Sequence, residues 1–114
     1  MPADLSLRPL LFVSSGFITW AVHFTAIYTY AATACALEPA SAGERLRPSI
    51  LSMTMLAIAA ELFIIGQTLP AWESGASGSS SDIFIGRLAT AVAAVATVVM
   101  VWETLPVLFL SSCQ

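Results

Sequence analysis

The chain alternates between three long apolar stretches and two short polar segments. The apolar stretches cover about residues 9–37, 48–69 and 83–110, and the polar segments cover about 38–47 and 71–82. Each apolar stretch provides the roughly 20 helical residues that cross about 30 Å of hydrocarbon. Backbone amides cannot stay unpaired in lipid, so membrane-crossing segments of this kind are helices rather than open strands. The pattern therefore predicts an all-α integral membrane protein, a bundle of three transmembrane helices.

Prolines and an aspartate mark the expected ends of these helices. Pro9 and Pro48 suit first-turn positions, where the missing N–H has no helical partner to lose. Pro70 is expected to end the second helix, because proline cannot continue the backbone hydrogen-bond pattern. Asp82 is a good N-cap for the third helix, since its carboxylate can accept hydrogen bonds from free backbone amides. The segment before Asp82 is rich in glycine and serine, which is typical of a flexible linker.

Composition agrees with this pattern and narrows the class of protein. Of 114 residues, 58% are hydrophobic and 10% are charged, and the mean hydropathy is +0.87, whereas charged residues make up about a quarter of soluble domains. The length allows one domain, 1–114, whose surface faces the lipid bilayer. The four basic residues are scattered arginines, so the chain lacks the basic patch that nucleic-acid binding requires. The first stretch is about twice as long as the apolar core of a signal peptide, so we expect it to be retained.

Three crossings place the ends of the first and third helices on the same side of the membrane, and each end carries a cysteine. Cys35 and Cys113 either form a disulfide or remain small unpaired apolar residues, which are common in membranes. Because they are the only cysteines and the topology brings them together, we expect the disulfide. Disulfides persist in oxidising compartments, which places the C-terminus in the periplasm of a bacterial inner membrane and the N-terminus in the cytoplasm. The arginines do not decide the orientation, because two flank each face.

Three ionisable side chains, those of His23, Glu61 and Glu103, are expected inside the membrane. An ionisable group near mid-bilayer costs several kcal/mol, so it needs a partner or a function. His23 and Glu61 both lie about 18–20 Å from the face that carries Cys35, whereas Glu103 is shallower by one to two turns. We therefore predict that His23 and Glu61 contact each other or share a partner.

The neighbours of these groups predict which helix faces point inward. In the first helix Trp20, His23, Ile27 and Tyr30 follow the spacing of a single stripe. Threonines and Glu61 recur every seven residues in the other two helices, and alanines in the third would allow close approach of another helix. These positions are Thr54, Glu61 and Thr68; Thr90, Thr97 and Thr104; and Ala91, Ala93, Ala94 and Ala96. The predicted buried polar network comprises Trp20, His23, Tyr30, Glu61 and Glu103.

Several roles for this network remain open. The side chains could only hydrogen-bond the helices together, or they could relay protons or contact a partner subunit. A third reading is haem ligation by His23, which would need a second axial ligand from another copy, a partner or a methionine. The sequence contains no metal-ligand cluster, nucleophile–base pair or phosphate loop, so we expect no catalytic residues, no metal site, no enzyme activity and no required cofactor.

Two phrases carry a resemblance to a known group of proteins. Residues 16–24 read GFITWAVHF and are followed by Ala34-Cys35-Ala36, and residues 101–108 read VWETLPVL and are followed by Cys113. Together they resemble small three-helix membrane proteins encoded beside cytochrome c oxidase genes in proteobacteria. The resemblance covers the first and third helices and poorly covers the middle one. It implies association with a terminal oxidase and no known activity.

The leading hypothesis is therefore an accessory or assembly subunit of a respiratory-chain membrane complex, best matched by a terminal cytochrome c oxidase. The rival hypothesis is a small oligomeric channel or transporter, because the threonine repeats with His23 and Glu61 could line a polar path between copies. A haem-binding cytochrome that uses His23 is the third hypothesis.

Overall fold

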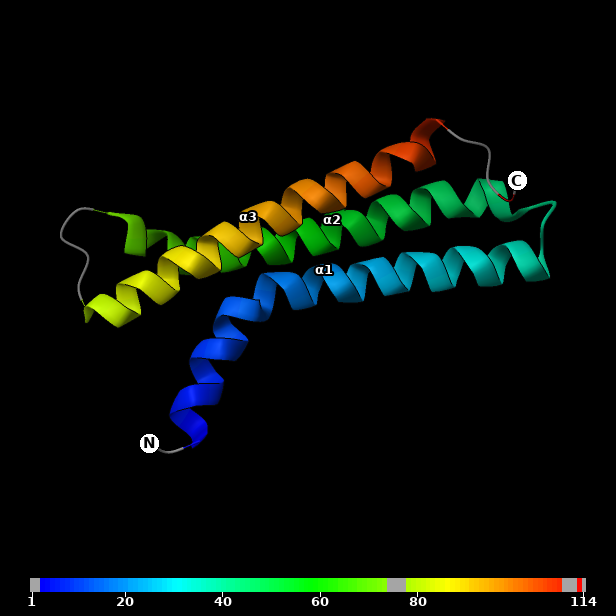
Figure 1. The fold of residues 1–114 in the computed structure, drawn as a ribbon. Helices are drawn as coiled ribbons and strands as arrows, with labels where there is room; N and C mark the ends of the chain where they lie inside the picture. The colour runs from blue at the N-terminus through cyan, green and yellow to red at the C-terminus, as the bar shows by residue number, and fades with distance from the viewer. Residues whose placement is uncertain (1–2, 74–77, 110–112, 114) are drawn as a thin grey trace.

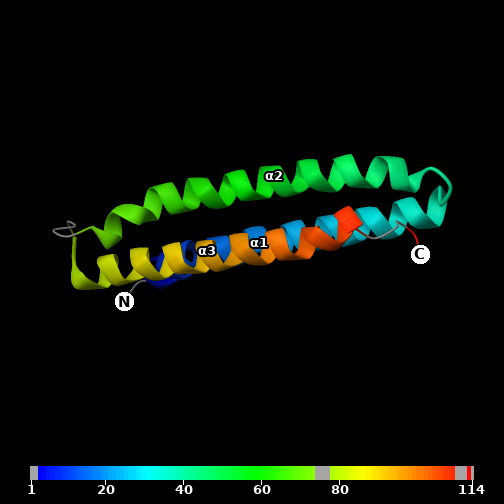
Figure 2. The same cartoon turned by 90° about the horizontal axis from the view of Figure 1, so that it is seen from above.

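Long helices make up nearly all of the structure. The computed structural model describes residues 3–73, 78–109 and 113 of the chain. It contains α1 (Ala3–Leu37), α2 (Ala42–Thr68) with the short 3₁₀ helix η1 (Leu69–Trp72), and α3 (Ser80–Phe109) (Figure 1). The three long helices pack against one another, and α2 forms a layer beside α1 and α3 (Figure 2). The predicted all-α fold with three helices is confirmed.

The outer surface of the bundle is that of a membrane protein. Each of the three long helices in the described part of the chain is long and apolar enough to cross a membrane, over Leu7–Leu37, Ala42–Trp72 and Ser80–Val107. Large apolar side chains point outward from all three, and the indole of Trp102 is 74% exposed. In water this surface would be unfavourable, whereas in a bilayer the lipid tails cover it. The chain is therefore a multi-pass membrane protein.

The N-terminal part of α1 bends away from the bundle (dark blue in Figure 1). Two hydroxyl groups bond to the backbone of the same helix here: Ser15 donates to the carbonyl of Phe12 at 2.7 Å, and Thr19 donates to the carbonyl of Ser15 at 2.9 Å. Side chains that bond back to helix carbonyls in this way bend helices, and Gly/Ser pairs are common sites of kinks. Both features occur at the Ser15–Gly16 pair, to which we attribute the bend of α1.

The starts of α1 and α2 differ from the predicted ones, which were placed at prolines. Pro9 and Pro48 lie inside α1 and α2, not in their first turns. The carbonyl that Pro48 cannot bond belongs to Glu44, which lies in the exposed first turn of α2, where water can satisfy the group. The early start of α2 shortens the first loop, across which the guanidinium of Arg45 contacts the carboxylate of Glu38 at 2.9 Å.

The end of α2 and the start of α3 lie closer to their predicted positions. α2 ends at Thr68 and passes into η1, which contains Pro70, so the predicted stop is confirmed. The predicted N-cap role of Asp82 is wrong: Asp82 lies in the first turn of α3, and its backbone N–H donates to the hydroxyl of Ser79 at 3.2 Å. An acidic residue in the first turn still interacts favourably with the helix dipole.

Small residues of α3 allow the other helices to approach closely. Ala89, Ala93 and Ala96 are buried. The predicted inward orientation is therefore confirmed for Ala93 and Ala96 and wrong for Ala91 and Ala94, which are exposed. These two alanines project from the lipid side of α3, because the buried positions follow the helical repeat that starts at Ala89.

η1 packs onto the start of α3 through a second close approach. A Cβ on Gly86 would lie 2.7 Å from the Cβ of Ala71. Beside it, the Nε–H of Arg87 donates to the carbonyl of Ala71 at 2.9 Å, and the guanidinium lies 5.6 Å from the ring centroid of Trp72. These contacts fix the end of the bundle next to the Gly/Ser linker, part of which lies outside the described residues.

Candidate functional site

The facing sides of α2 and α3 carry polar side chains at three levels, which we call the polar ladder. Its members are Thr54, Glu61 and Thr68 on α2 and Thr104, Thr97 and Thr90 on α3. All of them are buried except Thr97, which is half-buried, so the predicted inward orientation of both repeats is confirmed.

Hydrogen bonds between threonines form the two outer levels of the ladder. At one end Thr90 donates its hydroxyl to Thr68 Oγ1, with the oxygens 2.5 Å apart. At the other end the hydroxyl oxygens of Thr54 and Thr104 are 3.1 Å apart. Because α2 and α3 are antiparallel and both bonded pairs lie seven residues from the middle, Glu61 and Thr97 occupy the same level between them.

His23 joins the first helix to the ladder. Its Nε2 lies 2.9 Å from Thr54 Oγ1, and the imidazole is only 4% exposed. Since Thr54 also bonds to Thr104, one continuous chain of hydrogen bonds links α1, α2 and α3. The other ring nitrogen, Nδ1, is buried and has no hydrogen-bond partner among the described residues.

The predicted stripe of α1 faces the other helices. The indole N–H of Trp20 donates to Glu103 Oε1 at 3.0 Å, and the hydroxyl of Tyr30 lies 3.1 Å from that of Ser49. Each polar residue of the stripe therefore bonds to a neighbouring helix. Ser49 was missed by the sequence reasoning because it stands outside the seven-residue repeat.

Glu61 differs from the other members of the predicted network. Its side chain is 0% exposed, and neither carboxylate oxygen has a hydrogen-bond partner in the described part of the chain. The predicted contact or shared partner between His23 and Glu61 is therefore not formed, and His23 bonds to Thr54 instead. The depth estimate started α2 at Pro48, whereas α2 starts at Ala42. A shift of about six residues moves each depth on this helix by about 9 Å, which brings Thr54 to the level of His23.

All three helices meet at the carboxylate of Glu61. A Cβ on Gly16 of α1 would lie 2.8 Å from the Cα of Ala93 on α3 and 3.2 Å from Glu61 Oε2 on α2. Only glycine leaves room for this crossing without moving a backbone. The sequence reasoning missed Gly16 as a packing residue, although it lies one turn before Trp20 on the same stripe.

The cysteine pair closes the end of the bundle that lies opposite the Gly/Ser linker. The structure joins Cys35 to Cys113 in a disulfide, as predicted, with their Cα atoms 5.3 Å apart. Most of the segment that leads from α3 to Cys113 lies outside the described residues. The bond ties the C-terminal end of the chain to the end of α1.

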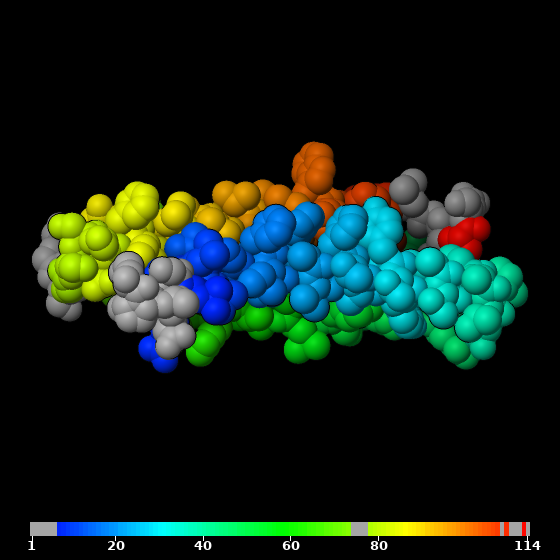
Figure 3. Space-filling model, turned by 60° about the horizontal axis from the view of Figure 1, so that its bottom comes forward, coloured from blue at the N-terminus to red at the C-terminus, as the bar shows by residue number. Residues whose placement is uncertain are grey.

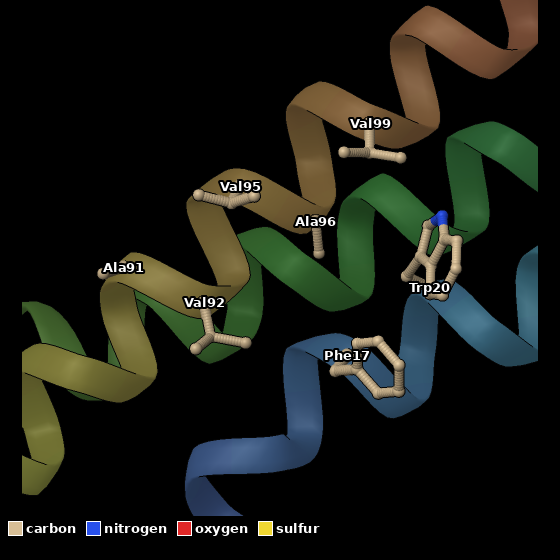
Figure 4. Close-up of a pocket in the computed structure, with 7 residues that line it drawn as sticks. All are labelled: Phe17, Trp20, Ala91, Val92, Val95, Ala96 and Val99. Atoms are coloured by element: carbon tan, nitrogen blue, oxygen red, sulfur yellow. The ribbon is translucent and has the colours of Figure 1, made fainter.

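An apolar groove runs between α1 and α3 on the outer surface (Figure 4). It has a volume of about 400 Å³ and is bordered by Phe17 and Trp20 on α1 and by small or β-branched residues on α3: Ala91, Val92, Val95, Ala96 and Val99. The aromatic border continues along α1, where the rings of Trp20 and Phe24 and those of Phe24 and Tyr28 have centroids 5.6 and 4.5 Å apart. In the space-filling view α1 crosses this face with α3 above it and α2 below (Figure 3).

Chemically, the side chains of the site can bind protons and form hydrogen bonds. The described residues contain no group of three or more His, Cys, Asp or Glu side chains placed to bind a metal ion. A haem iron would need access to a nitrogen of His23, whose Nε2 bonds to Thr54 and whose ring is enclosed by the helices. Comparison of the chain with protein-family models, with curated proteins and with solved structures gives no match in any of the three.

Proposed function

We propose that this chain is an accessory or assembly subunit of a larger membrane complex, and that the complex is a respiratory terminal oxidase. The choice of a terminal oxidase rests on the resemblance of the segments around Trp20 and Glu103 to proteins encoded beside cytochrome c oxidase genes. Those two side chains bond to each other, so the resembling segments lie together in the bundle.

The groove between α1 and α3 is the observation that supports a role as a subunit. Lipid tails do not drive helices together by hydrophobicity, so helix association in membranes depends on close packing over small residues. The groove offers such a surface: Ala91 and Ala96 line it on α3, and Phe17 and Trp20 line it on α1. Its shape and apolar lining suit a transmembrane helix of a partner subunit.

Affinity purification in mild detergent tests this proposal, and two exposed alanines on α3 give a matched pair of variants. Ala91→Phe would fill the groove, whereas Ala94 is exposed but does not line the groove. We expect the wild type and Ala94→Phe to retain a haem-containing partner, visible as a Soret absorption band, and Ala91→Phe to lose it. Purification of the wild type alone, without partner chains or a haem spectrum, would remove the support for this function.

The channel hypothesis draws less support from the contacts. Its premise is that the threonines line a path between copies, but Thr54, Thr68, Thr90 and Thr104 are buried inside one chain and bond to one another. A flux assay with the purified protein in liposomes tests this hypothesis directly. The cytochrome hypothesis is tested by the absorption spectrum of a haem-replete preparation of the isolated chain.

We further propose that the protein lies in a bacterial inner membrane with its C-terminus in the periplasm. The disulfide between Cys35 and Cys113 supports this orientation, because disulfides persist in the periplasm and not in the cytosol. A C-terminal fusion to alkaline phosphatase should be active, and a C-terminal fusion to a fluorescent protein that folds only in the cytoplasm should stay dark. The reverse result would invert the orientation.

A further inference from the structure

One buried group is left unexplained by the packing and by a subunit role: the carboxyl of Glu61. It lies at the middle level of the polar ladder, it is completely buried, and both of its oxygens lack hydrogen-bond partners among the described residues. Buried polar groups in native proteins are nearly always hydrogen-bonded. A carboxylate would also be an isolated charge inside a membrane, which is highly unfavourable without a counter-charge.

Among the residues that the structure describes, no cation compensates Glu61. The described salt bridge joins Arg45 to Glu38 at the loop end of the bundle. The other ionisable members of the predicted network with buried polar atoms are His23 on α1 and Glu103 on α3. His23 belongs to the neighbouring level of the ladder through Thr54, and Glu103 is held by Trp20.

A proton removes the buried charge without any rearrangement of the helices. A protonated carboxyl carries no charge and becomes a hydrogen-bond donor. Across the same level, the hydroxyl of Thr97 already donates to the carbonyl of Ala93 at 2.8 Å, so the lone pairs of its oxygen are free to accept. Ala93 is also the α3 residue that crosses Gly16 beside Glu61, so this acceptor lies one helical turn along α3 from the crossing.

We propose that Glu61 is a proton-binding site within the membrane. Its carboxylate takes one proton from hydronium, which leaves as water, and holds that proton as a neutral carboxylic acid at neutral pH. The proton exchanges with water through the neighbouring level of the ladder, where His23 Nδ1 and Glu103 Oε2 are also buried without hydrogen-bond partners. One ionisable group from each of the three helices thus has unused hydrogen-bonding capacity along the same interior. The inference does not depend on the oxidase proposal.

Infrared spectroscopy of the full-length, disulfide-bonded protein in bilayers of ether-linked phosphatidylcholine, which has no ester carbonyl groups to mask the signal, tests this proposal. At neutral pH, exposed carboxyl groups are ionised, since their ordinary pKa values are about 4. We therefore expect one carbonyl-stretch band of a protonated carboxyl, which disappears in Glu61→Gln and remains in Glu103→Gln. Transfer to deuterated buffer should shift the band, because the proton exchanges with water.

A second measurement keeps the proposal testable if the Glu61→Gln variant does not fold. Wild-type protein that carries ¹³C-labelled glutamate should show the band at lower frequency, which assigns it to glutamate without a substitution, and the Glu103→Gln variant then distinguishes Glu61 from Glu103. Absence of the band in the wild type would overturn the proposal, as would its loss in Glu103→Gln. A band that does not shift in deuterated buffer would also overturn it, because such a proton is a fixed part of the structure.

Discussion

Replacing Gly16 with alanine adds one methyl group at the point where the three helices meet. The new carbon would lie 2.8 Å from the Cα of Ala93, whereas carbon atoms in contact are normally about 3.5–4.0 Å apart. The shortfall is therefore about 0.7 Å. The obstructing atom belongs to the backbone and cannot rotate away, so α1 and α3 must separate. Overpacking of this kind costs about 1–3 kcal/mol, and we expect the free energy of unfolding to fall by that amount.

Gly66 provides the matched control on α2, because a Cβ at this position would meet nothing within 4 Å. Here the change to alanine removes only the conformational freedom of glycine and should raise stability by up to about 0.5–1 kcal/mol. The assay is unfolding in mixed micelles with increasing sodium dodecyl sulfate, followed by the helical circular dichroism signal. Equal unfolding free energies for the Gly16→Ala and Gly66→Ala variants would refute the close crossing of α1 and α3.

Three further predictions use the same unfolding assay. Trp20→Phe removes the donor to Glu103 and should lower the unfolding free energy by about 1–2 kcal/mol, whereas Trp102→Phe, at a lipid-exposed position, should change it by less than about 0.5 kcal/mol; similar losses in both variants would contradict the assigned hydrogen bond. Thr54→Val removes two hydrogen bonds and should lower the unfolding free energy by about 1–3 kcal/mol, while Thr54→Ser keeps the bonds to His23 and Thr104. A valine variant as stable as the wild type would show that this chain of bonds contributes nothing. Replacing either cysteine with serine opens a loop with a sequence separation of 78 and should cost up to about 4 kcal/mol, and alkylation of native membranes without reductant should leave both wild-type cysteines unmodified.

The pattern of apolar and polar positions determined the number of helices and, for the threonine repeats, which faces point inward. Apolar stretches long enough to cross a bilayer have one stable backbone conformation in lipid, so α1, α2 and α3 follow from composition and length. The seven-residue repeat of Thr54, Glu61 and Thr68 predicted burial correctly, because side chains at that spacing return to the same face of a helix. The cysteine pair followed from topology, since the two crossings between Cys35 and Cys113 bring both cysteines to one side.

Tertiary structure alone decided which polar groups meet. A helix start that is misplaced by about six residues shifts depth by about 9 Å, more than the reach of a hydrogen bond. The sequence therefore could not distinguish Glu61 from Thr54 as the partner of His23. Nor could it identify Gly16 as the crossing point, because a glycine in an apolar helix looks the same whether it faces lipid or another backbone. Burial of Glu61 without a partner is a property of three helices packed together, and only their arrangement in space reveals it.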